Sequence, residues 1–389
     1  MRIILFTQIY YPGHFDHIIN SLLEKEKDLI IYYLSGLADK EVVEKIKHPE
    51  RFKLFHMKEM PIQSELFGRY MMALYLQVQK KIFDEYSKSP DLIIMHVGSG
   101  LEIYVKDVFH NVPIIGLVEW FFPSSGDNID TLIDYSAKNK QLMNSIDICA
   151  VCVCATKFQR NSFPEKVRSK ILVSHEGIDL DFFSPKKRRK RGGVRSQKLK
   201  VITYVSRGLE PIRGFLEFIQ AIKKLFEYRN DFIVNIVGND YVYYETNSEN
   251  ISYMKKAREI LGSFSHKVNF LGKCSKNKVR DIFRESDLHV YFNRDYVVSW
   301  SLVEAMATGC LMLTSNDKGS MEFVVDGKNG FNVDYKNCDQ VFEKMNFLLD
   351  MDIRDKQLIC ENSRRSVRRL DINKSIDFWM RLIETVCIE

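Results

Sequence analysis

Short apolar runs alternate with helix-like segments along the whole chain, and this alternation constrains the fold more than any other feature. Examples are RIILFT at residues 2–7, DLIIMHV at 91–97, KVITYVS at 200–206 and DLHVYF at 287–292. Each run has the length and the Val, Ile and Leu content of a strand that is buried on both faces. Because strands separated by helices pair in parallel, the sequence predicts an α/β protein with doubly wound sheets.

The length of 389 residues exceeds what one hydrophobic core usually serves, so we expect two domains. The two halves meet at SPKKRRKRGGVRSQK, whose proline, glycines and charges are typical of an exposed connector. We therefore predict an N-terminal Rossmann-like domain at residues 1–184, a basic linker at 185–198, a C-terminal Rossmann-like domain at 199–371 and a final helix at 372–389.

The net charge of +6 is concentrated in this connector. Nine of the 57 basic residues lie between positions 186 and 200, and the remaining 48 are outnumbered by the 51 acidic residues. The basic run could bind nucleic acid or anionic lipid, but a solvated loop between domains is the interpretation that we favour. We expect no nucleic-acid partner.

The eight cysteines predict reduced, buried thiols in a cytoplasmic protein. Cys149 and Cys152 have a CxxC spacing, but no second pair follows, and in a strand the two side chains would point to opposite faces. We therefore expect no cysteine metal site. The chain has no apolar run of about 20 residues that could span a bilayer, and the segment after Met1 is too short and strand-like for a signal peptide.

The segment SWSLVEAMATG, residues 299–309, places a single acid, Glu304, on a small-residue helix between two predicted strands. A carboxylate in the first turns of such a helix lies at the carboxyl edge of a parallel sheet, where open α/β folds bind ligands. The flanking Val303, Ala305 and Met306 are expected to be buried. This favours a ligand site over the alternative of a solvated helix glutamate.

The segment YVSRGLEPIRGF, residues 204–215, predicts a site for a diphosphate. Arg207 ends a strand and Arg213 precedes a helix, with a glycine after each arginine. Guanidinium groups bind phosphate oxygens in bidentate fashion, and a helix N-terminus adds free N–H donors. Surface arginines are the alternative. No pair of aspartates in a DxD pattern follows a suitable strand, so we expect no metal ion and no cofactor besides the donor.

The block around Glu304 resembles the donor-binding region of retaining glycosyltransferases of family 4, whose pattern is Glu, seven residues, then Glu-Ala-Met-Ala-x-Gly. Glu304 matches the second acid, which in that family holds the ribose hydroxyls of the nucleotide. Tyr296 stands eight positions before it, in place of the first acid, which contacts the donor sugar. The chain resembles a subgroup in which an aromatic residue replaces that acid.

The resemblance extends over almost the whole chain, through MRIILFTQIYYPGHFDHI, PDLIIMHVGSGLEIYVKDVF, VPIIGLVEWFF, SHEGIDLDFFSP and ITYVSRGLEPIRGF. It implies the GT-B fold, with two Rossmann-like domains facing each other across a cleft. It also implies that Arg207 and Arg213 contact the donor pyrophosphate, and that the final helix crosses back to the first domain. A final helix packed on its own domain is the alternative.

Further site residues follow from the resemblance. Glu119 ends VPIIGLVE where many members have a histidine near the reacting carbon, so we assign it a catalytic role. Gly13 and His14 lie in the first strand-to-helix turn, where members approach phosphate and acceptor. His96, which ends DLIIMH before a glycine-rich turn, is a weaker candidate for a contact with the acceptor or phosphate, and a structural histidine is the alternative. A polar residue at a strand end is the alternative for Glu119, and a plain turn is the alternative at Gly13.

The remaining candidates lie in the second half of the chain. Gly238 and Gly272 end strands, and the family binds the nucleobase beside the second of these positions. Ser299 and Trp300 open the helix that carries Glu304, where backbone amides would meet the distal phosphate or sugar. Glu322 matches a carboxylate near the donor. Plain structural roles are the alternative for each of these residues.

Together these features predict a metal-independent, retaining glycosyltransferase that moves a sugar from a nucleotide-diphosphate sugar to a glycan or lipid-linked glycan. The resemblance favours a surface polysaccharide pathway and a cytoplasmic location. Peripheral contact with a membrane stays open, because a lipid-linked acceptor would require it. Two alternatives remain, namely a GT-B-like nucleotide-sugar epimerase and a non-catalytic scaffold that binds nucleotide sugars.

Overall fold

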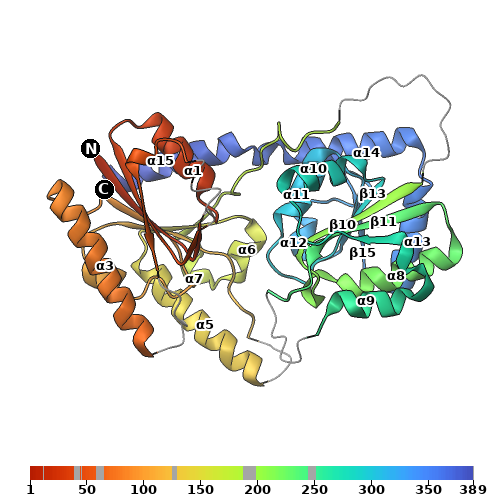
Figure 1. The fold of residues 1–389 in the computed structure, drawn as a ribbon, viewed down its shortest axis with the longest axis horizontal. Coiled ribbons are helices and arrows are strands. Elements are labelled where there is room, and N and C mark those ends of the chain that lie inside the picture. The colour runs from red at the N-terminus through yellow and green to blue at the C-terminus, as the bar shows by residue number, and fades with distance from the viewer. Residues whose placement is uncertain are drawn as a thin grey trace. The chain divides into compact units, whose positions relative to one another are not determined.

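The computed structural model describes residues 1–11, 13–38, 44, 46–57, 65–124, 129–186, 199–243 and 251–388 (Figure 1). The chain divides into two compact units. Unit 1 comprises Met1–Gly177 and Ile372–Glu389, and unit 2 comprises Ile178–Asp371. Each unit contains a parallel sheet with helices, so the prediction of two Rossmann-like domains is confirmed. Nearly all of the predicted linker at 185–198 lies outside the described residues.

Unit 1 has a parallel sheet in the order β5-β3-β1-β6-β7-β8-β9. The strands are β1 (Arg2–Thr7), β3 (Leu29–Ser35), β5 (Phe52–His56), β6 (Leu92–His96), β7 (Ile114–Leu117), β8 (Val151–Cys154) and β9 (Ile171–Val173). The helices are α1 (Asp16–Lys25), α3 (Glu65–Tyr86), α4 (Val105–Val108), α5 (Ile129–Ile148), α6 (Lys157–Ser162), α7 (Glu165–Arg168) and α15 (Ile372–Ile388). The short strands β2 (Tyr10–Tyr11) and β4 (Leu37–Ala38) pair separately.

The sheet of unit 1 is buried on both faces, as its uninterrupted apolar strands predict. Along β1, Ile3 and Leu5 join the hydrophobic cluster that includes residues of α3 and α5, whereas Ile4 and Phe6 join the cluster on the opposite face. This division follows from the two-residue period of a strand, which points successive side chains to opposite faces. A strand with both faces covered has no solvent side, which explains why its sequence does not alternate with polar residues.

The last helix, α15, belongs to the core of unit 1. Its Trp379 is only 1% exposed and packs edge-on against Phe15, with ring centroids 6.1 Å apart. Ile383 joins the same cluster, and α15 contacts α1 (Figure 1). The core of this unit is therefore assembled from both ends of the chain.

Unit 2 has a parallel sheet in the order β12-β11-β10-β13-β14-β15. The strands are β10 (Lys200–Gly208), β11 (Phe232–Asn239), β12 (Val268–Phe270), β13 (Leu288–Tyr291), β14 (Met312–Ser315) and β15 (Phe331–Val333). The helices are α8 (Phe215–Tyr228), α9 (Tyr253–Leu261), α10 (Lys276–Glu285), α11 (Trp300–Thr308), α12 (Lys318–Met321), α13 (Cys338–Leu349) and α14 (Ile353–Ser366).

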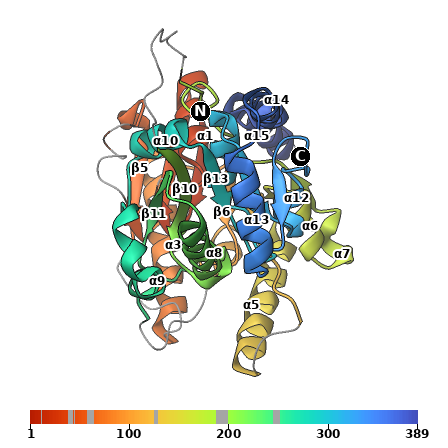
Figure 2. The same cartoon turned by 90° about the vertical axis from the view of Figure 1, so that its right-hand side faces the viewer.

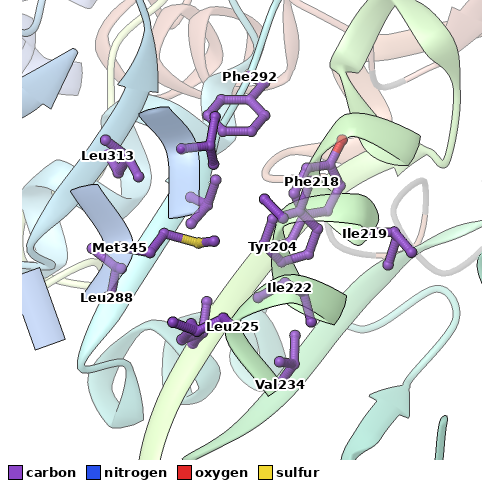
Figure 3. Close-up of a cluster of buried hydrophobic side chains, with 14 of the residues drawn as sticks. Tyr204, Phe218, Ile219, Ile222, Leu225, Val234, Leu288, Phe292, Leu313 and Met345 are labelled. Atoms are coloured by element: carbon purple, nitrogen blue, oxygen red, sulfur yellow. The ribbon is translucent and has the colours of Figure 1, made fainter. Parts of the chain in front are cut away.

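Helices α8 and α13 pack next to each other in unit 2 (Figure 2). The cluster beneath them includes Tyr204, Phe218, Leu288 and Met345, all buried (Figure 3). Tyr204 and Phe218 stack with ring centroids 4.9 Å apart. A second cluster contains buried residues of α10 and α11, so both faces of this sheet are also covered.

Two sequence-based expectations differ from the structure. The division between the units falls after Gly177 rather than after residue 184, because Ile178 and Phe183 pack into a cluster of unit 2 and the N–H of Ile178 donates to the carbonyl of Leu370 over 2.8 Å.

The second difference concerns the CxxC pair. Cys149 follows helix α5 and precedes β8, so it is not in a strand. A Cβ atom on Gly116 would lie 2.8 Å from Sγ of Cys149 and 3.2 Å from Sγ of Cys152, so both sulfurs lie beside the same glycine. The expectation of opposite faces is therefore wrong. All eight cysteines are free, and Cys149, Cys152 and Cys154 are buried.

Candidate functional site

Both sheets reverse their strand order at one point, and most of the predicted site residues follow the strands on either side of it. In unit 2 the reversal lies between β10 and β13, and in unit 1 it lies between β1 and β6. Open α/β sheets bind ligands at the carboxyl ends of the strands at such a reversal. Each unit therefore has a candidate site of its own.

Arg207 lies near the end of β10 in unit 2 and is exposed. Its guanidinium lies over the ring of Tyr243, with 4.0 Å between Cζ and the ring centroid. The backbone N–H of Tyr243 donates to Oε2 of the buried Glu210 over 2.9 Å. This stacking holds the guanidinium while keeping it accessible at the ligand edge of the sheet.

Arg213 is placed differently, because its side chain is buried and only 4% of the residue is exposed. Its Nη1 donates to Oδ1 of Asn293 over 2.6 Å, to the carbonyl of Val297 over 3.0 Å and to the hydroxyl of Tyr291 over 3.4 Å. All three acceptors belong to β13 or to the loop that leads into α11. Arg213 thus ties the turn before α8 to that loop.

Gly214 follows Arg213 with a positive φ of 59°, which favours glycine. A Cβ atom there would lie 2.8 Å from Cβ of Phe292. The close approach explains why this turn needs a glycine.

The loop that contains Tyr296 is fixed by further hydrogen bonds. Nδ2 of Asn293 donates to the carbonyl of Tyr296 over 2.7 Å, and the N–H of Asn293 donates to Oγ of Ser315 over 2.8 Å. The N–H of Ser299 donates to the hydroxyl of Tyr291 over 2.8 Å. Tyr291 therefore connects Arg213 with the start of α11, and Tyr296 lies half-buried between these anchors.

Helix α11 begins where the sequence predicts, with Ser299 as its cap. The hydroxyl of Ser301 donates to the carbonyl of Val205 over 3.2 Å, which joins the first turn of α11 to β10. Trp300 is half-buried at this helix start. The hydrogen bond brings the end of β10, and with it the Arg207 segment, next to the N-terminus of the helix that carries Glu304.

Glu304 is half-buried in α11, while its neighbours Val303, Ala305 and Met306 are buried as expected. Burial raises the pKa of this carboxyl to about 7, and the nearby Lys276 opposes the rise. An acid with this pKa exchanges its proton near neutral pH, and a hydrogen-bond donor that binds the carboxylate would favour its ionised form.

The other predicted residues of unit 2 are more dispersed along the sheet edge. The N–H of Gly238 donates to the carbonyl of Gly272 over 3.1 Å, so these two strand ends are adjacent. A Cβ atom on Gly272 would meet nothing within 4 Å, whereas one on Gly238 would meet Leu209 at 2.8 Å. Glu322 lies half-buried just after α12. The space at Gly272 leaves its backbone open to a ligand.

In unit 1 the first turn after β1 is built around Gln8. Oε1 of Gln8 accepts hydrogen bonds from the N–H of His14 over 3.1 Å and from the hydroxyl of Tyr33 over 3.3 Å. Gly13 has a φ of 51°, and a Cβ atom there would lie 2.2 Å from this same oxygen. The glycine therefore allows the turn that brings His14 to the end of the sheet.

His14, His96 and Glu119 come together at this edge of unit 1. Nε2 of His14 lies 3.4 Å from Oε1 of Glu119, and Nε2 of His96 lies 3.6 Å from Oε2 of the same carboxylate. The two imidazole rings are nearly parallel, with centroids 5.4 Å apart. His96 ends β6 and Glu119 follows β7, and these strands are paired in register, so the sheet itself sets the spacing.

Sequence reasoning missed Glu176, the fourth member of this cluster. Its Oε1 lies 2.7 Å from Nδ1 of His14, and its side chain is 8% exposed. Burial by itself would raise the pKa of Glu176, but His14 and His175 beside it hold the pKa below its usual value. The residue follows β9 in the segment SHEGID, where nothing local marks it as different from a solvated acid.

Comparisons with known proteins identify the family of this chain. Residues 73–183 match the family described as glycosyl transferase family 4 group, and residues 186–365 match the family described as glycosyl transferases group 1. The chain belongs to the GT-B glycosyltransferases related to family 4. The prediction of this family from the sequence is therefore confirmed.

Individual relatives of this chain are distant. It is 26% identical to spore coat protein SA of Bacillus subtilis, over 58% of this chain and 59% of that protein. It is 28% identical to the lipopolysaccharide 1,2-N-acetylglucosaminetransferase of Salmonella typhimurium, over 34% of each chain. The matched regions thus span less than two thirds of either relative.

Among solved structures, the chain is similar to Anabaena Alr3699/HepE in complex with UDP and glucose, with a TM-score of 0.74 and 15% identity. The similarity covers 99% of this chain and 100% of the Anabaena protein. At this identity the comparison establishes the fold.

In the described part of the chain, no helix is long and apolar enough to cross a membrane.

Proposed function

We propose that the chain is a retaining glycosyltransferase that moves a sugar from a nucleotide-diphosphate sugar to a hydroxyl of a glycan or lipid-linked glycan. The observation that carries this proposal is Glu304, a half-buried carboxyl with a raised pKa at the start of a helix beside the strand reversal of unit 2. A partly desolvated acid at this position is costly to the fold and suits recognition of hydroxyl groups.

Within unit 2, we assign the ribose hydroxyls to Glu304 and the diphosphate to Arg207. Arg207 is exposed and stacked on Tyr243, so it can bind phosphate oxygens while its orientation is maintained. The N-terminus of α11, at Ser299 and Trp300, would offer backbone N–H groups to the distal phosphate or the sugar. The open backbone at Gly272, next to Gly238, suits the nucleobase.

Arg213 contributes in a second way. Because its Nη1 is engaged by Asn293, Val297 and Tyr291, we propose that it positions the loop of Tyr296 and adds a fixed positive charge near the diphosphate. A preorganised charge of this kind stabilises the negative charge that develops on the leaving group. We propose that the two arginines make a metal ion on the diphosphate unnecessary. Tyr296 would then line the sugar side of the site, as in the subgroup that has an aromatic residue in place of the first acid.

In unit 1, we assign Glu119 to the sugar near its reacting carbon, where a carboxylate can accept a hydroxyl hydrogen bond or shield developing positive charge. Gly13, His14 and His96 would contact the phosphate or the acceptor. Transfer would take place on one face of the sugar, with the departing diphosphate oxygen accepting the proton of the attacking hydroxyl. Glu322 remains a weaker candidate for a donor contact.

The nature of the donor and acceptor is supported by what the relatives are named for. The Anabaena protein was solved with UDP and glucose, and the Salmonella relative is a lipopolysaccharide N-acetylglucosaminetransferase. These names favour a sugar nucleotide as donor and a glycan as acceptor. A cytoplasmic location, in a pathway of polysaccharide synthesis, fits such substrates.

The test is product analysis with the purified full-length chain. UDP- and GDP-sugars are incubated with oligosaccharide acceptors, and products are separated by mass spectrometry and examined by NMR. Transfer with the donor's anomeric configuration is expected, and EDTA should not abolish it. An inverted linkage would refute retention, and an isomerised sugar nucleotide without a transfer product would indicate an epimerase.

Variants separate the proposed catalyst from a scaffold. Glu304→Gln and Arg207→Ala should each lower kcat/KM by at least tenfold, whereas Glu343→Gln, a matched change on the exposed side of α13, should not. Equal activity of Glu304→Gln and the wild-type chain would overturn the assignment of this residue. Nucleotide-sugar binding without turnover on any acceptor would favour the scaffold.

A further inference from the structure

We propose that His14, His96 and Glu119 form a Zn²⁺ site in unit 1, at which the ion inhibits transfer. The ligand atoms of these residues all lie within 4.8 Å of one another. Two imidazoles and one carboxylate are a ligand set that zinc sites with an open position use. The site goes beyond the proposed function, and zinc binding to it is independent of any sugar nucleotide.

The separations between the atoms suit ligands of one ion better than hydrogen bonds. The distances of 3.4 Å and 3.6 Å from the two Nε2 atoms to the carboxylate of Glu119 exceed the usual N–H···O range of about 2.7–3.2 Å. Two ligands of a tetrahedral Zn²⁺, each about 2.0–2.1 Å from the ion, lie roughly 3.4 Å apart. Each distance is therefore close to an edge of such a tetrahedron, and because the two distances end on different oxygens of Glu119, the carboxylate has to turn for all three residues to bind one ion.

The distance between the two imidazole rings fits the same geometry. With Zn–N bonds of that length, the centroids of two imidazoles on one tetrahedral ion lie roughly 5 Å apart. The centroids of His14 and His96 are separated by 5.4 Å. Because the two ring planes lie within 12° of parallel, one ring has to rotate before the lone pairs of both Nε2 atoms point at the same ion.

Glu176 supplies the support that metal-bound histidines usually have. Its Oε1 lies 2.7 Å from Nδ1 of His14, the ring nitrogen that would not face the ion. A carboxylate on that nitrogen fixes the proton there, orients the ring and leaves Nε2 with a lone pair for the metal. Glu176 thus lies at ion-pair distance from Nδ1 of His14, where it would favour the tautomer that zinc binding requires.

The backbone holds the proposed ligands in place and leaves room for a further one. His96 pairs with Leu117 across β6 and β7, and Glu119 follows two residues later, so both ligands are anchored in the sheet. His14 is anchored by its N–H to Gln8. The side chain of Glu119 is 36% exposed, which leaves space for water as the fourth ligand.

The ligand types select the metal and determine its effect. Imidazole nitrogens suit Zn²⁺, whereas Mg²⁺ prefers oxygen ligands in an octahedral arrangement. A bound Zn²⁺ would occupy the carboxylate of Glu119, which would then be withdrawn from the sugar. This inhibitory part rests on the proposed role of Glu119, and it is compatible with transfer that needs no metal on the diphosphate.

The binding test uses the full-length protein after removal of metals with EDTA and dialysis. Isothermal titration with Zn²⁺ should give one site per chain, with no binding of Mg²⁺ in the same range. His14→Ala, His96→Ala and Glu119→Gln should each weaken binding at least tenfold, and Glu176→Gln about 10–100-fold. His110→Ala, which changes an exposed histidine of unit 1 outside the cluster, is the matched control and should bind like wild type.

Two further measurements keep the interpretation unambiguous. Circular dichroism and the melting temperature show whether each variant is folded. A glutamine variant at the same position, His14→Gln or His96→Gln, replaces an alanine variant that is not. Co²⁺ in place of Zn²⁺ should give a visible spectrum without the sulfur-to-cobalt band of cysteine ligands. Binding unchanged in every cluster variant, or a thiolate band, would overturn the site.

The inhibition test is separate from the binding test. Donor turnover by the wild-type chain should fall as Zn²⁺ is added, and a chelator should restore it. Zinc bound at the cluster with turnover unchanged would overturn the inhibitory role alone. If the chain transfers sugar but binds no zinc, the zinc site is wrong and the proposed function stands. If the chain binds zinc at the cluster but transfers no sugar, the zinc site stands and the proposed function is wrong.

Discussion

Replacing Glu304 with glutamine tests the central assignment, because the pKa of about 7 predicts how nucleotide affinity depends on pH. If only the carboxylate form accepts hydrogen bonds from the ribose hydroxyls, affinity follows its ionised fraction. With this pKa, about one carboxyl in ten is ionised at pH 6 and about nine in ten at pH 8. The Kd of UDP or GDP should therefore be about tenfold higher at pH 6 than at pH 8, which corresponds to about 1.4 kcal/mol.

Glutamine has nearly the same shape as glutamate but does not titrate. The Glu304→Gln variant should bind the nucleotide more weakly at pH 8 and should lose this pH dependence. The terminal phosphate of the nucleotide also titrates, with a pKa of about 6, so the wild-type curve alone is ambiguous. The ratio of the two proteins' Kd values at each pH removes that contribution, because both proteins bind the same ligand.

The assay is isothermal titration from pH 5.5 to 8.5 at constant ionic strength. Repeating it in buffers with different ionisation enthalpies also measures protons directly, and wild type should release more protons on binding than Glu304→Gln near pH 6.5. Identical pH profiles for the two proteins would show that Glu304 does not hold the ribose. If the well-folded wild-type chain binds neither UDP nor GDP at any pH, the nucleotide site itself is refuted.

The remaining predictions concern the effects of Glu304, of the hydrogen bonds of Arg213 and of Gly214 on the stability of the fold. The pKa of Glu304 in the folded chain lies above its ordinary value of 4.5, so folding favours the protonated carboxyl. The stability linked to this proton is fully present below about pH 4.5 and is lost as the pH rises through about 7. Glu304→Gln should therefore raise the free energy of unfolding at pH 8 by at most about 3 kcal/mol and leave it unchanged at pH 4, as measured by thermal melts. Arg213→Met should lower the free energy of unfolding by about 2–3 kcal/mol, because the buried oxygens of Asn293 and Val297 lose a charged donor. A melting temperature equal to that of the wild-type chain would show that these hydrogen bonds do not stabilise the loop. Gly214→Ala should cost more than Gly309→Ala, because Gly309 is also left-handed but a Cβ atom there would come no closer than 3.3 Å to Pro185, so that about 1 kcal/mol is expected for it. Equal melting temperatures of the two variants would show that the contact with Phe292 is easily relieved.

The fold was predictable because its signals are local. Strands buried on both faces appear as uninterrupted apolar runs, and the serine before the Glu304 helix and the glycine after it mark its ends. The family also followed from residues that lie close together in the chain, such as the segment 299–309. The burial of Val303 and Ala305 followed from composition alone.

The environment of single side chains was less predictable, because it depends on contacts between distant segments. The three acceptors of Arg213 lie more than 70 residues away in the chain, so a buried arginine and an exposed phosphate ligand have the same local sequence. Glu176 lies beside His14 although β6, β7 and β8 separate β9 from β1 in the sheet, so no strand pairing in the sequence predicts the contact. Cys149 was assigned to a strand because an apolar helix end and an apolar strand are indistinguishable over so few residues.

The position of α15 has a consequence for the order in which the chain matures during synthesis. Trp379 and Ile383 complete the core around Phe15, yet they emerge from the ribosome after every residue of unit 2. Unit 2 has all of its own strands and can mature first, while the nascent first unit keeps an apolar face exposed to chaperones. A stop codon that removes only this helix would thus uncover residues translated at the very start of the message.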